Sequence, residues 1–324
     1  MPNNITIKEA AERLLAWDNI CVYSHASPDG DTLGSASALL HVLESMGKKT
    51  AFRCSDEYAN KFSYLFEGLD LDLKEENIEH HVTVDVADPK LLGKYYDLYT
   101  EDNDFFCLAI DHHATHVPFA REEWVVGGEP SNCELMYNLF CEMNVNITAD
   151  VASCVYTGLA TDTGCFKYAS VKPSTHIIAA KLMELGADAA RINRVMFDTK
   201  TKAYIAAEQL VLSKIRYYGD GKVAVIDITK DICEKTGATQ SDIDILPSVP
   251  RMIEGVLVGI TLKEKDGGIW KASVRAVSPA DASAICKKFG GGGHIGAAGC
   301  AFDSGVTLEE AEKGLVEAAL ENIG

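Results

Sequence analysis

Residues 20–53 read ICVYSHASPDGDTLGSASALLHVLESMGKKTAFR, and this stretch predicts the architecture of the first part of the chain. The apolar run at 20–25 is typical of a buried strand, and residues 34–47 have the pattern of a helix that ends at Gly47. A second apolar run follows at 49–53. A strand, a helix and a strand at this spacing predict the start of a β-α-β series, whose strands run parallel.

The same alternation continues along the first half of the chain. Short apolar runs predict further strands at 81–86 and 105–110, and periodic patterns predict helices at 7–19, 131–143, 148–160 and 174–186. Ser131-x-x-Glu134 has the pattern of a capping box at the start of one of these helices. We therefore expect an α/β fold with a mostly parallel sheet that is flanked by helices and covered on both faces.

The pattern changes in the second half of the chain. Residues 191–217, with a helical pattern from 199, predict a helical linker between a first domain, 1–190, and a second domain, 218–324. The elements expected in the second domain are strands at 222–228, 255–263 and 269–277, and helices at 280–289 and 307–320. They predict a smaller α/β domain with a mixed sheet. We expect the active-site cleft to lie between the two domains.

Composition limits the class of protein. The chain has 324 residues, of which 47% are hydrophobic and 24% charged, the balance of a folded protein with a sizeable core. Its net charge of −18 argues against binding to duplex DNA, which needs many Lys and Arg contacts to phosphates. The sequence has no signal-peptide pattern or membrane-spanning run, and its ten cysteines form no C-x-x-C pair. We expect a cytoplasmic protein with free thiols and no membrane partner.

The strongest chemical signal follows the predicted strand at 20–25. His25, Asp29 and Asp31 lie on a turn shaped by Pro28 and Gly30, so their three side chains can point at one small volume. An ordinary Asp-Gly turn would explain an isolated Pro-Asp-Gly sequence. Ligands of parallel sheets bind at the carboxyl ends of the strands. Polar residues at the other strand ends therefore decide between a ligand-binding cluster and an ordinary turn.

Other predicted strands end in the same residue types. Asp111-His112-His113 closes one strand, Asp85 ends another, and Asp162 follows a predicted helix. Adjacent histidines also occur in solvated loops, and we interpret His80-His81 in that way. Mixed carboxylate and imidazole ligands are typical of a two-metal site. This ligand set favours two Mn²⁺ ions per active site, with Mg²⁺ or Co²⁺ as alternatives.

Several segments carry a resemblance to a known family. They are Ser-His25-Ala-Ser-Pro-Asp-Gly-Asp-Thr-Leu-Gly-Ser35, Val-Asp85, Asp-His-His113, Thr-Gly-Leu-Ala-Thr-Asp162-Thr-Gly, Lys271-Ala-Ser-Val-Arg275 and Phe289-Gly-Gly-Gly-Gly-His294-Ile-Gly-Ala-Ala-Gly299. The set resembles the DHH family of phosphoesterases, and within it the nanoRNase and pAp phosphatase branch. The last two segments resemble the associated DHHA1 domain. Together they span nearly the whole chain in the expected order.

The resemblance implies a role for each matching residue. The implied metal ligands are His25, Asp29 and Asp85 for one ion, and Asp31, Asp85, His112 and Asp162 for the other. Asp85 would bridge the two ions. The resemblance places His113 beside the scissile phosphate, as a group that neutralises charge or donates a proton, and Asp111 behind the histidines, which it would orient.

A glycine cluster in the second domain predicts a phosphate site. Residues without Cβ let backbone N–H groups approach an anion, so we assign Gly291, Gly292, Gly293 and the following His294 to a terminal phosphate of the substrate. The alternative is a tight helix end, for which one glycine would suffice. Arg275, at the end of a predicted strand, is a second candidate for phosphate binding.

These observations predict a hydrolase that acts on short single-stranded RNA (nanoRNA, including linear dinucleotides such as pApA) or on the 3′,5′-bisphosphate nucleotide pAp. Three alternatives stay open: a pyrophosphatase or polyphosphatase with the same metal site, a RecJ-like single-strand exonuclease, and a nucleotide-binding regulatory module without catalysis. The sequence allows a homodimer but contains no pattern that predicts one.

Overall fold

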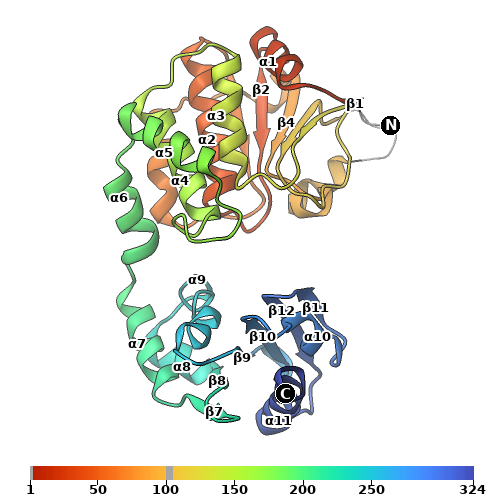
Figure 1. Cartoon of the computed structure of the whole chain (residues 1–324). Coiled ribbons are helices and arrows are strands. Elements are labelled where there is room, and N and C mark those ends of the chain that lie inside the picture. The colour runs from red at the N-terminus through yellow and green to blue at the C-terminus, as the bar shows by residue number, and fades with distance from the viewer. Residues whose placement is uncertain (1–2, 100–104) are drawn as a thin grey trace. The chain divides into compact units, whose positions relative to one another are not determined.

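The computed structural model describes residues 3–99 and 105–324. The chain divides into two units, Met1–Thr199 and Lys200–Gly324, and each has its own sheet and its own core (Figure 1). All ten cysteines are free thiols. None of the helices within the described ranges is long and apolar enough to span a bilayer.

The first unit contains the predicted parallel sheet. Its strands are β1 (Asn3–Asn4), β2 (Ile20–Tyr23), β3 (Thr50–Arg53), β4 (His80–Val84), β5 (Leu108–Asp111) and β6 (Glu122–Val125). They lie in the order β1-β6-β5-β4-β2-β3, and every neighbouring pair is parallel. Strands β2, β4 and β5 are therefore adjacent, and their carboxyl ends meet at one edge of the sheet.

Helices cover one face of this sheet. They are α1 (Ile7–Ala16), α2 (Gly30–Ser45), α3 (Asn132–Glu142), α4 (Ala149–Asp162), α5 (Pro173–Glu184) and α6 (Ala189–Asn193), and Figure 1 shows α2 to α5 grouped on one side. Alternate strand residues such as Ile20 and Val22 pack beneath the helices. The opposite face, with Cys21 and Tyr23, is covered by the 3₁₀ segment η3 (Pro89–Leu98) and loops. Both faces are covered, as expected, but among residues 3–99 and 105–199 the α-helices lie on only one.

Two helix starts differ from the sequence-based prediction. Helix α2 begins at Gly30 rather than at residue 34, because the Asp29 carboxylate caps it and accepts backbone N–H groups at 3.0 and 3.1 Å. At the start of α3, Ser131 Oγ accepts the N–H of Glu134 at 3.1 Å. The Glu134 carboxylate accepts instead from Thr175 Oγ1 at 2.9 Å, so the predicted reciprocal capping box is only half formed.

Glycines let α2 and α4 pack closely. A Cβ at Gly34 would lie 2.6 Å from the Cys154 carbonyl oxygen. A Cβ at Gly158 would lie 2.6 Å from Asp31 Oδ1 and would overlap the sulfur of Cys133. The close approach of the two helices thus also fixes the surroundings of the Asp31 carboxylate.

The second unit contains the predicted mixed sheet. Its strands are β7 (Arg216–Tyr218), β8 (Val223–Ile228), β9 (Val258–Glu264), β10 (Trp270–Ala276), β11 (Gly292–His294) and β12 (Ala297–Phe302). They lie in the order β11-β12-β10-β9-β8-β7, with β8 and β9 parallel and all other pairs antiparallel.

Helices cover the two faces of the second sheet unequally. The helices are α7 (Lys202–Leu212), α8 (Lys230–Thr236), α9 (Gln240–Ile243), α10 (Ala282–Lys287) and α11 (Leu308–Ile323). One face forms a core with α10 and α11 that reaches from β8 to β12. On the other face, α7, α8 and α9 pack over the β8 side, where Ile226 and Ile228 are buried. The 3₁₀ turns η5 (Leu246–Ser248) and η6 (Pro250–Met252) extend this cover over β9 to β10.

The close contact at Gly158 leads to a prediction. Gly158→Ala should lower the free energy of unfolding by about 1–3 kcal/mol, because the added methyl group overlaps Cys133 and Asp31 in a packed core. Urea denaturation followed by circular dichroism measures the change. Ser153→Ala, a change on the same helix, serves as the control. An unchanged unfolding midpoint for Gly158→Ala would contradict the packing described here.

Candidate metal centre

Three strand ends bring a carboxylate between two histidines. Residues His25, Asp85 and His112 follow the adjacent strands β2, β4 and β5. His25 Nε2 lies 3.6 Å from Asp85 Oδ2, and His112 Nε2 lies 3.4 Å from Asp85 Oδ1. Each oxygen of the Asp85 carboxylate therefore faces a different imidazole.

Two further carboxylates come from the loop and helix after β2. Asp29 caps α2, and its Oδ1 lies 3.8 Å from His25 Nε2. Asp31 points toward the start of α3, where it accepts the backbone N–H groups of Asn132 at 2.6 Å and Cys133 at 2.9 Å. The free N–H groups and the dipole at a helix N-terminus favour a carboxylate in this position.

The predicted ligands form two clusters. In each cluster the candidate ligand atoms lie within 4.8 Å of one another, and the clusters are His25, Asp29 and Asp85, and Asp31, His112 and Asp162. A third group that meets the same limit, Asp85, His112 and His113, shares one residue with each of them. His112 Nε2 lies 3.7 Å from both Asp31 Oδ2 and Asp162 Oδ2. All six residues predicted as ligands are thus brought together, with Asp85 between the clusters.

Asp85 combines backbone strain with an unsatisfied oxygen. Its φ is 59°, a left-handed conformation that non-glycine residues adopt rarely, and its side chain is only 3% exposed. Its backbone N–H bonds to the Ile110 carbonyl oxygen at 2.9 Å, which ties the residue to β5. Within the described part of the chain, the buried Oδ1 has no hydrogen-bond partner. A buried oxygen in this state is suited to binding a cation.

The pKa values of the aspartates and histidines in this site also indicate that it favours positive charge. Burial raises the pKa of Asp31 well above its ordinary value and the pKa of Asp162 to about 6, and the nearby Asp85 carboxylate adds to both shifts. Burial disfavours the charged form of the histidines, but contact with Asp85 outweighs it and raises the pKa of His25 to about 9 and of His112 to about 10. The donor set, rich in aspartate with two histidines, fits divalent metal ions.

Asp111 and His113 lie beside these clusters. Asp111 is buried, and its Oδ1 lies 2.8 Å from His113 Nδ1. The His113 side chain is 40% exposed, so its other ring nitrogen is accessible. His113 Nδ1 also lies 3.7 Å from Asp85 Oδ1, which places the ring next to the proposed ligands.

A second histidine, His116, also contacts Asp111, and the sequence pattern did not predict this contact. His116 Nδ1 lies 2.7 Å from Asp111 Oδ2, and His116 Nε2 lies 3.5 Å from Glu123 Oε1. Glu123 in turn accepts the N–H groups of Phe119 and Ala120 at 2.7 and 3.1 Å. The position of His116, three residues after His113, could have drawn attention to it. The sequence around Glu123 does not indicate that this residue is buried, because its burial follows from the pairing of β6 within the sheet.

His80 and His81 differ from the expectation of a solvated pair. His80 stacks on Trp17 with ring centroids 4.5 Å apart. His81 Nδ1 lies 3.0 Å from the Tyr23 hydroxyl, and its ring stacks on Phe105. Neither histidine belongs to the clusters of candidate ligands among the described residues. Aromatic packing therefore accounts for this pair.

In the second unit, sheet register brings the predicted phosphate-binding residues together. Arg275 on β10 pairs with Ala297 on β12, and Ala297 pairs with His294 on β11. Directly paired residues in antiparallel strands point to the same face, so Arg275 and His294 share a face about 10 Å apart, two strand spacings.

The glycine cluster divides into two parts. The N–H groups of Gly290 and Gly291 bond to carbonyl oxygens of the last turn of α10, at 3.2 and 3.0 Å, so these glycines end the helix, as in the alternative considered above. Gly292 and Gly293 belong to β11. A Cβ at Gly293 would lie 2.6 Å from the Ala297 carbonyl oxygen, whereas a Cβ at Gly292 would face open space.

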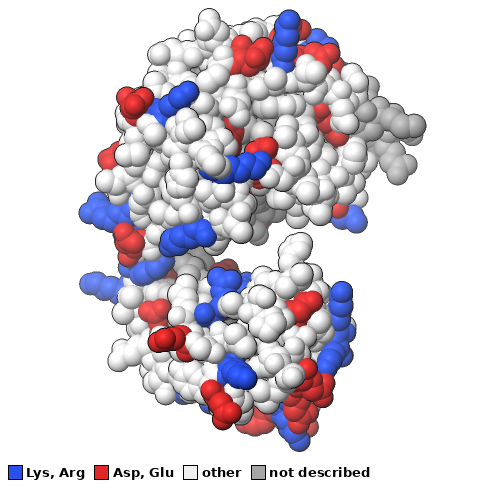
Figure 2. All heavy atoms as spheres, in the orientation of Figure 1, with Lys and Arg blue, Asp and Glu red and all other residues white. Residues whose placement is uncertain are grey.

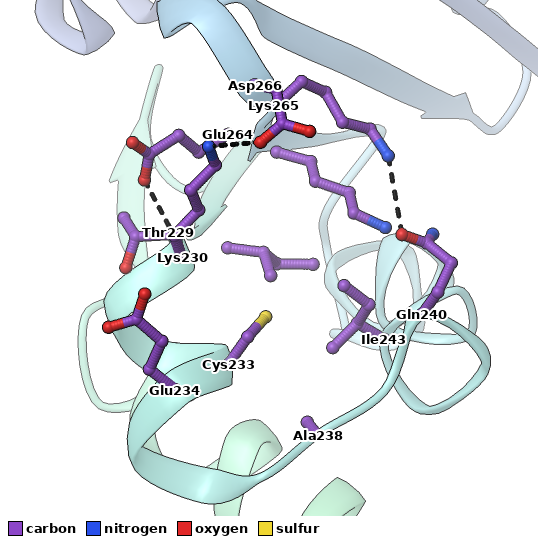
Figure 3. Close-up of a pocket in the computed structure, with 12 residues that line it drawn as sticks. Thr229, Lys230, Cys233, Glu234, Ala238, Gln240, Ile243, Glu264, Lys265 and Asp266 are labelled. Atoms are coloured by element: carbon purple, nitrogen blue, oxygen red, sulfur yellow. Dashed lines mark hydrogen bonds and ion pairs between the residues drawn. The ribbon is translucent and has the colours of Figure 1, made fainter.

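A separate cavity of about 330 Å³ lies at the ends of β8 and β9 (Figure 3). Its charged groups pair with one another: Lys230 Nζ lies 2.6 Å from Asp266 Oδ1, and the Lys230 N–H bonds to Glu264 at 2.9 Å. Lys265 Nζ contacts Gln240 Oε1 at 3.5 Å. The described residues that line this cavity include none of the predicted site residues.

Comparison with known families identifies the class of protein. Residues 19–159 match the N-terminal domain of the DHH family, and residues 220–324 match the DHHA1 domain. The two matches cover most of the chain and occur in the order that the sequence motifs predicted. The chain therefore contains a DHH domain followed by a DHHA1 domain.

Individual relatives narrow the assignment. The bifunctional oligoribonuclease and PAP phosphatase NrnA of Thermus thermophilus is 28% identical over 317 residues, which cover 94% of this chain and 90% of that protein. An exopolyphosphatase-related protein from Bacteroides fragilis has a TM-score of 0.85 at 27% identity, covering 97% of this chain and 95% of the other. The predicted resemblance to the nanoRNase and pAp phosphatase branch is confirmed.

The fold also extends to a more distant group. RecJ from Thermus thermophilus in complex with Mn²⁺ has a TM-score of 0.55 at 16% identity, covering 97% of this chain and 55% of that chain. At this identity the likeness concerns the fold alone.

The shared position of Asp85 leads to a second prediction. Asp85→Asn should reduce Mn²⁺ uptake, measured by isothermal titration calorimetry, and should lower turnover by roughly 1,000-fold or more, because it removes the charged carboxylate that lies between His25 and His112. Asparagine also tolerates the left-handed backbone conformation. The exposed Asp150→Asn on α4 is the matched control. Wild-type Mn²⁺ uptake in Asp85→Asn would contradict the shared role.

The histidine pKa values lead to a third prediction. In the protein without metal, His25 and His112 have pKa values of about 9 and about 10, so both hold protons at neutral pH. Metal ligation requires neutral imidazole, so binding must release protons. Apparent Mn²⁺ affinity should rise by roughly 10- to 100-fold per pH unit between about pH 6 and 8. Calorimetry in buffers of different ionisation enthalpy counts the released protons, and a pH-independent affinity would be the opposing result.

Proposed function

We propose that this protein is a metal-dependent phosphoesterase that hydrolyses short oligoribonucleotides, including linear dinucleotides, and the bisphosphate nucleotide pAp. The observation that carries the proposal is the pair of ligand clusters that meet at Asp85. Support comes from the DHHA1 domain and from relatives named oligoribonuclease and PAP phosphatase. The ten free thiols fit a reducing compartment such as the cytoplasm.

The proposed metal ligands are His25, Asp29, Asp31, Asp85, His112 and Asp162. Manganese suits the mixed carboxylate and imidazole set, and a solved structure of the same fold is described as a complex with Mn²⁺. When bound, two such ions supply Lewis acidity, which makes a water molecule more acidic and neutralises charge on the phosphate.

His113 and Asp111 are the proposed catalytic pair. Hydrogen bonding between Asp111 Oδ1 and His113 Nδ1, at 2.8 Å, fixes the orientation of the imidazole ring. The same contact assigns the Nδ1 proton to the bond with the carboxylate and leaves Nε2 for the substrate. His113 would then hydrogen-bond to a phosphate oxygen or donate a proton to the leaving oxygen.

In the second unit, the proposed role of Arg275, Gly292, Gly293 and His294 is to bind a phosphate at the end of the substrate away from the cut. The N–H of Gly291, which the sequence also suggested for this role, already bonds to Cys286 at the end of α10. Gly292 and His294 are exposed on the edge strand β11. The Arg275 guanidinium bonds to the Val274 carbonyl oxygen at 3.2 Å and has no carboxylate partner among the described residues. An arginine in this state is available for a phosphate group.

A substrate panel tests this function. We expect Mn²⁺-dependent hydrolysis of pAp, pApA and an RNA five-mer to be at least about tenfold more efficient, in kcat/KM, than hydrolysis of an RNA 24-mer or pyrophosphate. Product release is followed by chromatography and phosphate assay, and EDTA should stop every reaction that depends on the metals. Preference for pyrophosphate or for the 24-mer would contradict the proposed substrate class. Tight Mn²⁺ binding without hydrolysis of any substrate would favour a binding module.

A further inference from the structure

The second sheet has an open surface around Arg275. Along β10, Ala272 and Val274 are buried beneath α10 and α11, whereas Lys271, Ser273 and Arg275 point to the other face and are only partly covered or exposed. The helices that cover this other face pack mainly at the β8 side of the sheet. Two 3₁₀ turns extend this cover over β9 to β10, whereas the residues of β12 and β11 on this face are partly or fully exposed beside Arg275.

Small residues surround the Arg275 side chain. Its direct cross-strand neighbours are Gly259 on β9 and Ala297 on β12, and neither can cover the guanidinium. On the next rung of the same face, Thr261 pairs with Ser273. Thr261 is 1% exposed, and its hydroxyl has no hydrogen-bond partner in the described part of the chain. The direct neighbours of Arg275 are thus small, and the buried Thr261 hydroxyl on the next rung lacks a partner.

A second arginine, Arg251, lies on the same face as Arg275, over the neighbouring strand β9. Arg251 belongs to the 3₁₀ turn η6 (Pro250–Met252), which packs on β9. A Cβ at Gly259 would lie 3.0 Å from both the Arg251 nitrogen and the Pro250 Cβ. Gly259 and Arg275 are directly paired, so a Cβ at Gly259 would point to the same face of the sheet as the Arg275 side chain. Arg251 therefore joins the sheet on the Arg275 side.

The two arginines act on each other electrostatically. Burial lowers the pKa of Arg275, and the positive charge of Arg251 lowers it further. Within residues 3–99 and 105–324, neither guanidinium has a carboxylate partner, although the chain carries 48 acidic residues against 30 basic ones. Two neighbouring guanidinium groups without a counter-charge form a site for an anion.

We propose that Arg251 and Arg275 together bind a terminal phosphomonoester, and that Arg251 determines specificity for substrates with such an end group. The proposal rests on the function proposed above, to which it adds a residue and a selection rule. A phosphomonoester carries a charge of about −1.5 to −2 at pH 7, whereas a 5′-hydroxyl end carries none. Two guanidiniums therefore favour pApA over ApA more strongly than one can.

Steady-state kinetics on pApA and ApA tests the rule. In Arg251→Gln, kcat/KM for pApA should fall by about 10- to 100-fold, the loss of a charge-assisted hydrogen bond, while kcat/KM for ApA stays within about threefold of wild type. Arg251→Lys should restore part of the preference. Lys271→Gln is the matched control, because it removes a cation from the same face about 13 Å along β10.

Each outcome has a distinct meaning. A wild type that does not prefer pApA would overturn the end-phosphate part of the proposed function. A strong preference that is lost in Arg275→Gln and His294→Ala but kept in Arg251→Gln would overturn the role of Arg251 alone. Equal losses on both substrates in Arg251→Gln would show a structural role and would also overturn it.

A binding measurement keeps the test independent of catalysis. AMP carries the phosphomonoester, and it is titrated into the full-length protein in EDTA. Because EDTA removes the metals, the titration measures binding without catalysis. We expect Arg251→Gln to weaken AMP binding by about tenfold or more and Lys271→Gln to leave it unchanged. Wild-type AMP affinity in Arg251→Gln, with an unchanged melting temperature, would sink the proposal.

Discussion

The collection of four aspartates in one small volume is the constraint on which the first unit depends. Asp29, Asp31, Asp85 and Asp162 lie around the two histidines His25 and His112. Carboxylates in such a buried group repel one another unless protons, imidazolium groups or metal ions supply positive charge. The raised pKa values of Asp31 and Asp162 express this repulsion. This repulsion is unfavourable for stability, and a bound cation would relieve it.

The rest of the unit holds this unfavourable arrangement in place. The start of α3 provides two N–H groups for Asp31, and the bond from Asp85 to Ile110 holds Asp85 at the end of the sheet. Gly158 permits the close helix contact beside Asp31. Behind the candidate ligands, Asp111 links two histidine rings, so the partly exposed ring of His113 is attached to a buried network.

The second unit uses small residues in a similar way. At the end of β10, Gly259 and Ala297 flank the half-buried Arg275 with small residues, and Gly259 also allows η6 to pack close to β9. Gly293 permits β11 to lie against β12. In both units, the absence of side chains at a few positions decides where the charged groups can lie.

Much of the fold followed from local patterns. Apolar runs and helical periods predicted both sheets and most helices, because burial of one face imposes those periods. The patterns missed β1, β6, β7, β11 and β12, which are short or lie at or near sheet edges. They also placed the start of α2 too late, since the Asp29 cap lies in a segment that reads as a turn. His116 and Glu123 escaped notice because only tertiary burial makes them partners.

The sequence by itself determined the kind of chemistry. It contained the candidate ligands, the motifs of the family and the glycine cluster, all of which are short stretches that can be read without knowing which distant segments meet. Only the tertiary structure decided that Asp85 is left-handed and lies between two histidines, and that Arg251 shares a sheet face with Arg275. These features depend on strand order and register, which are set by contacts between residues far apart in the chain and leave no local period to read.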